Sequence, residues 1–147
     1  MRKVRNSKSE QGHSSPTHFE VMLGADVNRI SPVVGLVMRL VGDLDYAAGK
    51  EFEIEMALRE ALANAILHGC KADPAKEIEC SVTGDKDRGI SIVVRDPGAG
   101  FDVANLASPT VEQNLFSDHG RGIYLINALM DEVKYERNGS EIHMRKY

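Results

Sequence analysis

The sequence predicts an α+β fold, a two-layer α/β sandwich in which helices cover one face of a mostly antiparallel sheet. Two observations support this prediction. Several short segments carry apolar residues at every second position, and longer segments carry them at helical spacing. Their order is strand, helices, strand pair, loop, helix and strand pair, which is typical of α+β domains. The length of 147 residues suits one domain.

The N-terminal part of the chain divides into a polar segment and a first strand. Residues 1–16 are rich in Ser, Lys, Arg and Gln, so we expect a disordered tail there and assign residues 17–147 to the folded domain. The alternation from Phe19 to Leu23 indicates an edge strand. Ser31-Pro32 then fits an N-cap with a first-turn proline, and the apolar spacing behind it predicts a helix.

The middle of the chain predicts a second helix and a hairpin. The helix covers roughly Phe52 to His68, because its apolar residues recur on one face. Two alternating strands follow, joined by a hairpin loop over Asp85–Gly89. The residues expected to face inward are Ile78, Cys80 and Val82 on one strand, and Ile90, Ile92 and Val94 on the next.

The C-terminal third begins with an irregular segment from Asp96 to His119. A loop of this length in a compact domain is usually functional or mobile. We expect a third helix from near Gly122 to about Met130. A final hairpin then turns at Asn138-Gly139.

Composition narrows the function classes. The formal net charge of -4 gives no electrostatic reason to expect binding to nucleic acid or to an anionic membrane. Cys70 and Cys80 lie outside metal-ligand and redox spacings, so we expect free thiols in a reducing compartment. The sequence has no apolar stretch of bilayer length and no hydrophobic signal region at its start. The cytoplasm is therefore the expected location.

The first chemical motif lies on the second helix, in EALANAILHG. Glu60 and Asn64 are four residues apart, so they project from the same helix face. A carboxamide oxygen suits Mg²⁺, which often bridges to substrate phosphates, and a carboxylate can accept a proton from a nucleophile. A solvated polar helix face would give the same pattern, and these two residues alone favour that alternative. His68 continues the same row, and we interpret it as a packed or capping residue.

The second and third motifs are rich in glycine. Asp96 follows a strand and precedes Gly98 and Gly100, so the backbone can approach a ligand while the carboxylate accepts a hydrogen bond from an amino group such as that of adenine. Further along, the segment Gly120-Arg121-Gly122 precedes the third predicted helix, whose free N–H groups favour an anion. Arg121 could add a charge-assisted contact to a phosphate. Taken singly, each motif also fits a plain turn or loop-to-helix junction.

The ordered set is more specific than its parts. E-x-x-x-N on a helix, D-x-G-x-G after a strand and G-x-G after a long loop together resemble the Bergerat ATP-binding fold of the GHKL superfamily. Within that superfamily the stretches REALANAILHG, VVRDPGAGFD and GRGIYLINALMDEV are similar to the RsbW-type anti-sigma-factor kinases. The resemblance covers nearly all of the chain beyond its N-terminal residues.

The resemblance implies roles for individual residues. Glu60 would be the general base, Asn64 would ligate Mg²⁺ at the ATP phosphates, and Asp96 would accept a hydrogen bond from the adenine amino group. Residues from about 104 to 119 would form a flexible lid over the nucleotide. The other implied nucleotide-binding positions are Gly98 and Gly100 beside Asp96, Gly120, Arg121 and Gly122 at the phosphates, Ile123 next to them, and Ser140 at the start of the last strand.

By resemblance, the chain is expected to be a homodimeric protein-serine kinase that uses ATP and Mg²⁺. It would bind a sigma factor and phosphorylate a serine of a small STAS-type antagonist. The main alternative is a non-catalytic ATP-binding adapter that acts by partner binding alone, although Glu60 argues against it because an adapter needs no base. A histidine-kinase fragment and an α+β domain without a ligand remain further alternatives.

Overall fold

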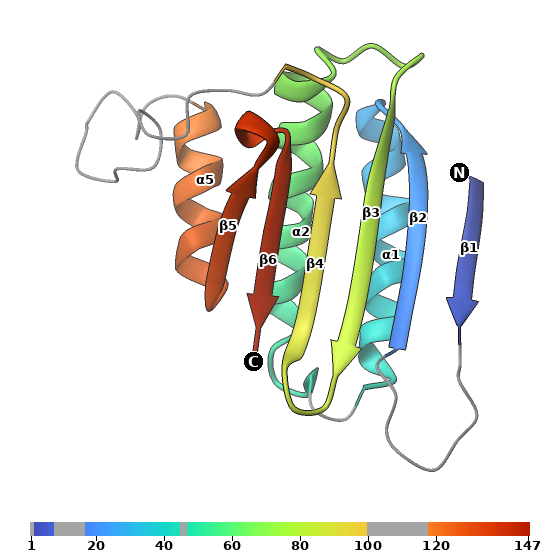
Figure 1. Cartoon of the computed structure of the whole chain (residues 1–147), viewed down its shortest axis with the longest axis vertical. Helices are drawn as coiled ribbons and strands as arrows, with labels where there is room; N and C mark the ends of the chain where they lie inside the picture. Colours follow the sequence, from blue (N-terminus) through green and yellow to red (C-terminus); the bar gives the residue numbers. More distant parts are fainter. Residues whose placement is uncertain (1, 8–16, 45–46, 100–117) are drawn as a thin grey trace.

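A computed structural model of the chain describes residues 2–7, 17–44, 47–99 and 118–147. Their strands form one antiparallel sheet in the order β1-β2-β3-β4-β6-β5, with the helices on one face (Figure 1). The strands are β1 (Arg2–Ser7), β2 (Thr17–Gly24), β3 (Glu77–Asp85), β4 (Gly89–Arg95), β5 (Glu132–Glu136) and β6 (Glu141–Lys146). The α-helices are α1 (Ile30–Gly42), α2 (Glu51–Asn64) and α5 (Asp118–Leu129). The predicted α+β sandwich is therefore confirmed.

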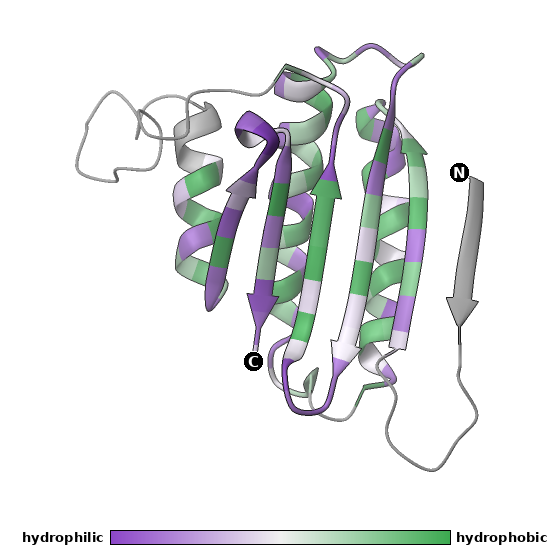
Figure 2. Ribbon diagram, in the orientation of Figure 1, coloured by the Kyte–Doolittle hydropathy of each residue, from purple (hydrophilic) through white to green (hydrophobic). Residues whose placement is uncertain are grey.

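The core lies between the sheet and the helices, and α2 packs against both α1 and α5. Alternate strand residues turn toward it, which produces the banding of hydrophobic and hydrophilic positions along the strands (Figure 2). The predicted inward residues of β3 and β4 are all buried. The buried residues of α2 are Ile54, Ala57, Leu58, Ala61 and Leu62, a stripe at helical spacing that the sequence predicted. Both cysteines are free, as expected, and both are buried.

The N-terminal region differs from its expected form. Residues 2–7 were assigned to a disordered tail, whereas the structure places them in β1, paired antiparallel with β2. The prediction that β2 is an edge strand is therefore wrong, because β2 lies between β1 and β3. Backbone pairing does not require an apolar side-chain pattern, so a polar segment can extend a sheet at its edge. Residues 8–16 lie outside the described ranges, and the division of the chain at residue 17 stays a prediction.

Two helix starts also differ from their predictions. Ser31 is not an N-cap, because α1 already begins at Ile30. A short 3₁₀ turn, η1 (Val27–Arg29), precedes the helix, and the Asp26 side chain caps that turn by accepting a hydrogen bond from the Asn28 N–H. Helix α5 begins at Asp118 rather than near Gly122, so its glycines lie inside the helix. Glycine in a helix costs only about 1 kcal/mol relative to alanine, which neighbouring contacts can offset.

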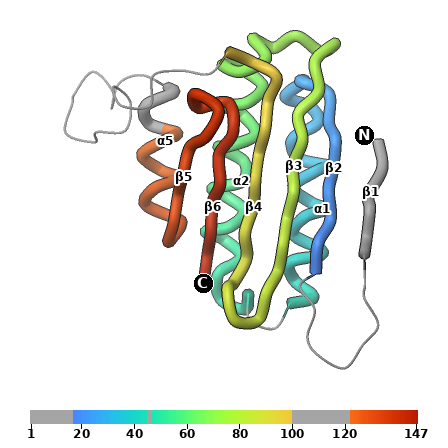
Figure 3. Tube along the Cα trace, viewed as in Figure 1, coloured from blue at the N-terminus to red at the C-terminus, as the bar shows by residue number. Residues whose placement is uncertain are grey.

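The C-terminal end of α2 has a form that the sequence did not predict. The helix continues as a π-helical turn, η3 (Ala65–Gly69), closed by a hydrogen bond of 2.8 Å from the Cys70 N–H to the Ala65 carbonyl. Lys71 and Ala72 then take positive φ angles of 52° and 55°, which reverse the chain direction. The end of α2, the end of β4 and the β5–β6 turn consequently gather at one end of the molecule (Figure 3).

The helices within the described ranges are too short or too polar for any of them to cross a lipid bilayer.

Candidate functional site

A cavity of about 220 Å³ opens where α2, β4 and the β5–β6 turn meet. Its wall combines apolar side chains with a few polar groups, the usual make-up of a ligand site. The lining residues are Ala61 and Asn64 of α2, Ala65, His68 and Gly69 of η3, Val94 and Asp96 at the end of β4, Ile123 of α5, and Tyr135, Gly139, Ser140 and Ile142 of the last hairpin. This volume is below the roughly 300–1,000 Å³ of sites that enclose a drug-sized ligand, so it would bury only part of a nucleotide.

Four of the residues that the sequence analysis named for ligand binding line this cavity. They are Asn64, Asp96, Ile123 and Ser140. Glu60 lies one turn before Asn64, at the contact between α2 and α5. A Cβ placed on Gly122 would lie 3.0 Å from Glu60 Oε2 and 3.1 Å from Asn64 Nδ2. The structure therefore brings Glu60, Asn64 and Gly122 together beside the cavity.

The position of Gly122 changes the interpretation of the third motif. The sequence analysis placed this glycine before the helix, among the free N–H groups at its start. In the structure Gly120 belongs to the first turn of α5, whereas Gly122 lies beyond that turn, where N–H groups bond within the helix. Gly122 instead provides the close approach of α5 to Glu60 and Asn64.

Two further predictions fall on parts of the chain that are not described. Gly100 and most of the expected lid, residues 104–117, lie outside the described ranges, as does the side chain of Arg121. Their roles stay predictions.

Asp96 is the acidic residue of the cavity wall. Its backbone N–H donates to the Ser140 carbonyl at 2.9 Å, which ties the end of β4 to the last hairpin. Its Oδ1 accepts a hydrogen bond of 2.7 Å from the Gly98 N–H. Burial raises the pKa of the Asp96 carboxyl, while the Gly98 bond and the charge of Lys76 act in the opposite direction. A half-buried carboxylate held in this way is a strong acceptor for an N–H group of a ligand.

Ser140 has a structural contact that its predicted role did not include. Its hydroxyl donates to the Arg137 carbonyl at 2.8 Å and so closes the 3₁₀ turn η4 (Arg137–Gly139). Arg137 and Asn138 have positive φ angles of 52° and 57° in this turn. The hydroxyl oxygen can still accept a hydrogen bond from a ligand, since a hydroxyl carries two lone pairs.

The sequence analysis missed several residues of the wall. Gly69 was treated only as the end of the second helix, yet a Cβ on it would overlap the Asp96 carboxylate. Tyr135 was not singled out, although its place on the inward face of β5 could have been inferred from alternation. His68 is exposed at the cavity wall, so it is not packed in the core, while the alternative interpretation as a capping residue stays a prediction. All three residues reach the cavity wall through the fold, which brings η3 and β5 together there.

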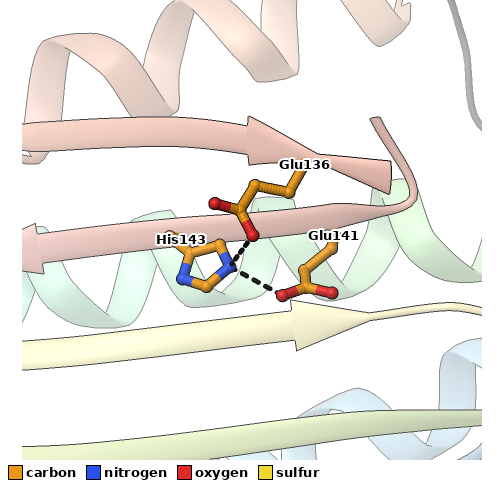
Figure 4. A group of neighbouring side chains, drawn as sticks. All are labelled: Glu136, Glu141 and His143. Carbon is orange, nitrogen blue, oxygen red and sulfur yellow. Dashed lines mark hydrogen bonds and ion pairs between the residues drawn. The ribbon is translucent and has the colours of Figure 1, made fainter. Parts of the chain in front are cut away.

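A second cluster of polar side chains lies on the opposite, open face of the sheet (Figure 4). His143 Nε2 lies 2.7 Å from Glu141 Oε1 and 3.4 Å from Glu136 Oε2, so these three groups could in principle ligate a metal ion. The Arg95 guanidinium already donates to Glu141 Oε2 at 2.7 Å and lowers the pKa of that carboxyl. We interpret this cluster as a network of ion pairs that ties β4, β5 and β6 together.

The cavity has the features that a nucleotide needs. An apolar wall suits a flat base, and Asp96 offers a carboxylate acceptor. Within the described part of the chain, no lysine or arginine side chain forms an ion pair with it. The carboxamide of Asn64 provides an oxygen of the kind that Mg²⁺ prefers. The residues present therefore fit ATP with Mg²⁺.

Comparison with known proteins gives a consistent result. The family described as histidine kinase-like ATPase domain matches residues 23–146. The chain is 32% identical over 102 residues to serine-protein kinase RsbW of Bacillus licheniformis, a match that covers 65% of this chain and 63% of that protein. It is 27% identical over 143 residues to RsbW of Bacillus velezensis, covering 91% and 88%. It is 26% identical over 121 residues to the anti-sigma F factor of Priestia megaterium, covering 76% and 79%.

Proposed function

Since the chain belongs to the histidine kinase-like ATPase domain family, we propose that it is an ATP-binding protein-serine kinase of the anti-sigma-factor type. Relatives named serine-protein kinase RsbW and anti-sigma F factor support this assignment. The match to RsbW of Bacillus licheniformis spans 63% of that protein, so the activity and the partners of this chain are part of the proposal.

The observation that carries the proposal is the position of Asp96. Burial in a cavity with apolar walls raises the pKa of the Asp96 carboxyl, because its ionised form has lost water. A ligand that donates a hydrogen bond to the carboxylate would stabilise this ionised form. The exocyclic amino group of adenine is such a donor. The cavity volume of about 220 Å³ suits the base, with the phosphates directed toward the α2–α5 contact.

The residues at the α2–α5 contact supply the chemistry. The serine hydroxyl oxygen of the substrate would form a bond to the terminal phosphorus of ATP, and Glu60 would accept the proton of that hydroxyl. The bond between this phosphorus and the bridging oxygen would break, and ADP would leave. Asn64 would hold Mg²⁺, which neutralises charge on the phosphates when bound. Backbone N–H groups in the first turn of α5, including that of Gly120, would favour the phosphate anion.

The name anti-sigma F factor supports a sigma factor as the binding partner, and the name serine-protein kinase supports a protein serine as the substrate. The resemblance described in the sequence analysis adds the rest of the proposal: a STAS-type antagonist that carries this serine, a homodimeric state and a cytoplasmic location. Phosphorylation of the antagonist would release it, leaving the sigma factor bound.

The proposal is tested by calorimetry with ATP, with and without Mg²⁺. We expect Mg²⁺-dependent binding that Asn64→Ala abolishes. The matched control is Asn28→Ala, which removes an exposed carboxamide from η1 and should bind as the unaltered chain does. Unchanged affinity in Asn64→Ala would refute the metal-ligand role. Binding of ATP without transfer of its terminal phosphate to a STAS protein would favour the non-catalytic adapter instead.

A further inference from the structure

The π-helical turn at the end of α2 lies directly against the turn that carries Asp96. A Cβ added to Gly69 would overlap the Asp96 carboxylate, with both carboxylate oxygens among the atoms it meets. A Cβ added to Gly98 would overlap the carbonyl oxygen of Gly69 and would lie 2.7 Å from Asp96 Oδ1. Gly69 and Gly98 therefore both lie close against the carboxylate, and neither leaves room for a side chain.

The π turn is what brings Gly69 to this place. The hydrogen bond from the Cys70 N–H to the Ala65 carbonyl spans five residues, so the last turn is wider than an α-helical turn. A second hydrogen bond, 2.8 Å from the Ala72 N–H to the Ile66 carbonyl, fixes the chain where it leaves the turn. Gly69 thus lies on backbone that is held at both ends, and it cannot easily move away from Asp96.

We infer that Gly69 is a positioning residue that sets the orientation of the Asp96 carboxylate and thereby the selectivity for a base with an exocyclic amino group. The inference rests on the proposed function. Asp96 Oδ1 is engaged by the Gly98 N–H, so the rest of the carboxylate is available to the ligand only in the orientation that Gly69 permits. A side chain at position 69 would displace the carboxylate, and a hydrogen bond to it would be lost or bent.

The two glycines differ in what a methyl group would meet. At Gly69 it would meet the end of a side chain, which can rotate, so the fold should survive and the acceptor should move. At Gly98 it would meet the backbone oxygen of Gly69, which cannot rotate away, so the packing of η3 on the end of β4 should suffer. The inference therefore predicts loss of selectivity from the first substitution and loss of stability from the second.

The experiment compares ATP with inosine triphosphate, which carries a carbonyl where adenine carries its amino group. Calorimetry measures both affinities for the full chain, for Gly69→Ala and for the control Gly35→Ala, whose added Cβ meets no atom within 4 Å. The unaltered chain and the control should prefer ATP by about 10- to 100-fold, the range of one hydrogen bond to a charged group. Gly69→Ala should lower the affinity for ATP to near that for inosine triphosphate and leave the latter within about twofold.

The possible outcomes separate the positioning role of Gly69 from the proposed function. An unchanged ratio of the two affinities in Gly69→Ala, or an equal loss of both, would overturn the positioning role. A Gly69→Ala chain that fails to fold, judged by its thermal unfolding, would contradict the claim that only a side chain must move. If the unaltered chain binds no ATP at all, the proposed function fails first. If it binds ATP and Gly69→Ala keeps the preference, only the inference about Gly69 fails.

Discussion

Two carboxylates next to Arg95 have opposite surroundings. Asp96 follows Arg95 in the chain and lines the cavity, and burial raises its pKa. Glu141 faces Arg95 across the β4–β6 pair, and the hydrogen bond from the Arg95 guanidinium lowers its pKa, although its side chain is only 5% exposed. Burial alone therefore does not decide how a carboxylate titrates. A direct hydrogen bond from a cation decides it for Glu141, whereas the Lys76 charge only partly offsets the effect of burial on Asp96. Of the two carboxylates, we interpret Asp96 as the one with an acceptor to offer a ligand.

The contrast extends to the two faces of the sheet. On the open face, Glu141 and Glu136 are both paired with His143, and Arg137 lies 3.9 Å from Glu141. These polar groups are paired with one another within the protein. On the helix-covered face, Asp96 accepts a hydrogen bond from the Gly98 N–H and the Ser140 hydroxyl donates to the Arg137 carbonyl, so both are held by backbone atoms. We interpret the first arrangement as structural and the second as prepared for a ligand.

The largest expected effect is on phosphate transfer, and it tests whether the Glu60 carboxylate acts as the general base. Glu60→Gln should keep ATP binding but lower phosphate transfer by roughly two to four orders of magnitude, because the general base is removed. The measurement is transfer of labelled phosphate to a STAS protein under single-turnover conditions. The control is Glu55→Gln on the same helix, where the carboxylate pairs with Arg59. A rate close to that of the unaltered chain in Glu60→Gln would mean that another group takes the proton.

Asp96→Asn should lower ATP affinity by about 10- to 100-fold, because a charged acceptor becomes a neutral one. The same change should increase stability at neutral pH. The folded-state pKa of Asp96 is above its ordinary value, so the folded protein loses stability as pH rises from that value through the raised one. Asparagine cannot ionise and can still accept the Gly98 bond. Calorimetry with ATP measures the affinity, and urea unfolding at pH 5 and pH 7 measures the stability. A variant less stable than the unaltered chain at neutral pH would contradict the stability prediction.

Glu141→Gln should have the opposite effect on stability and little effect on ATP. Loss of the charged partner of Arg95 should cost on the order of 1–2 kcal/mol, the lower part of the range for such bonds because Arg95 is 40% exposed. The folded-state pKa of Glu141 is below its ordinary value of 4.5, so the contribution is present above that value and disappears as pH falls through the lowered one. The difference in urea midpoint between the two chains should therefore be constant near neutral pH and shrink in acid. A difference that grows as the pH falls would rule out this account.

The sequence could predict features that follow a regular spacing of residues, but not features that depend on how distant segments pack. The core-facing residues of β3, β4 and α2 follow simple periods, so they were found from the sequence. Strand β1 was missed because its pairing uses backbone groups of a polar segment. The π turn was missed because the apolar period is the same for an α-helical and a π-helical last turn, and the difference arises from packing.

The candidate site shows the same division. Glu60, Asn64 and Asp96 stand in short motifs whose spacing carries chemistry, so they could be named before the structure was known. The role of Gly69 depends on how closely η3 approaches the end of β4, and no local pattern encodes that distance. Tyr135 enters the cavity wall from the far end of the chain, through the pairing of β5 with β6. Residues of this kind require the tertiary structure.

The smallest expected effect concerns a charge that belongs to neither region. Arg59 pairs with Glu55 at 3.2 Å and donates to the Ser31 hydroxyl at 3.2 Å, and both charged side chains are more than a third exposed. Solvent screens such a pair, so Arg59→Ala should cost only about 0.3–1 kcal/mol in urea unfolding and leave ATP affinity unchanged. Glu60 is the next residue on the same helix, so this variant tests whether the face turned to α5 can be separated from the face turned to solvent. A loss of phosphate transfer in Arg59→Ala would show that the Arg59–Glu55 pair also affects the reaction, which would contradict the separation of Glu55 from Glu60.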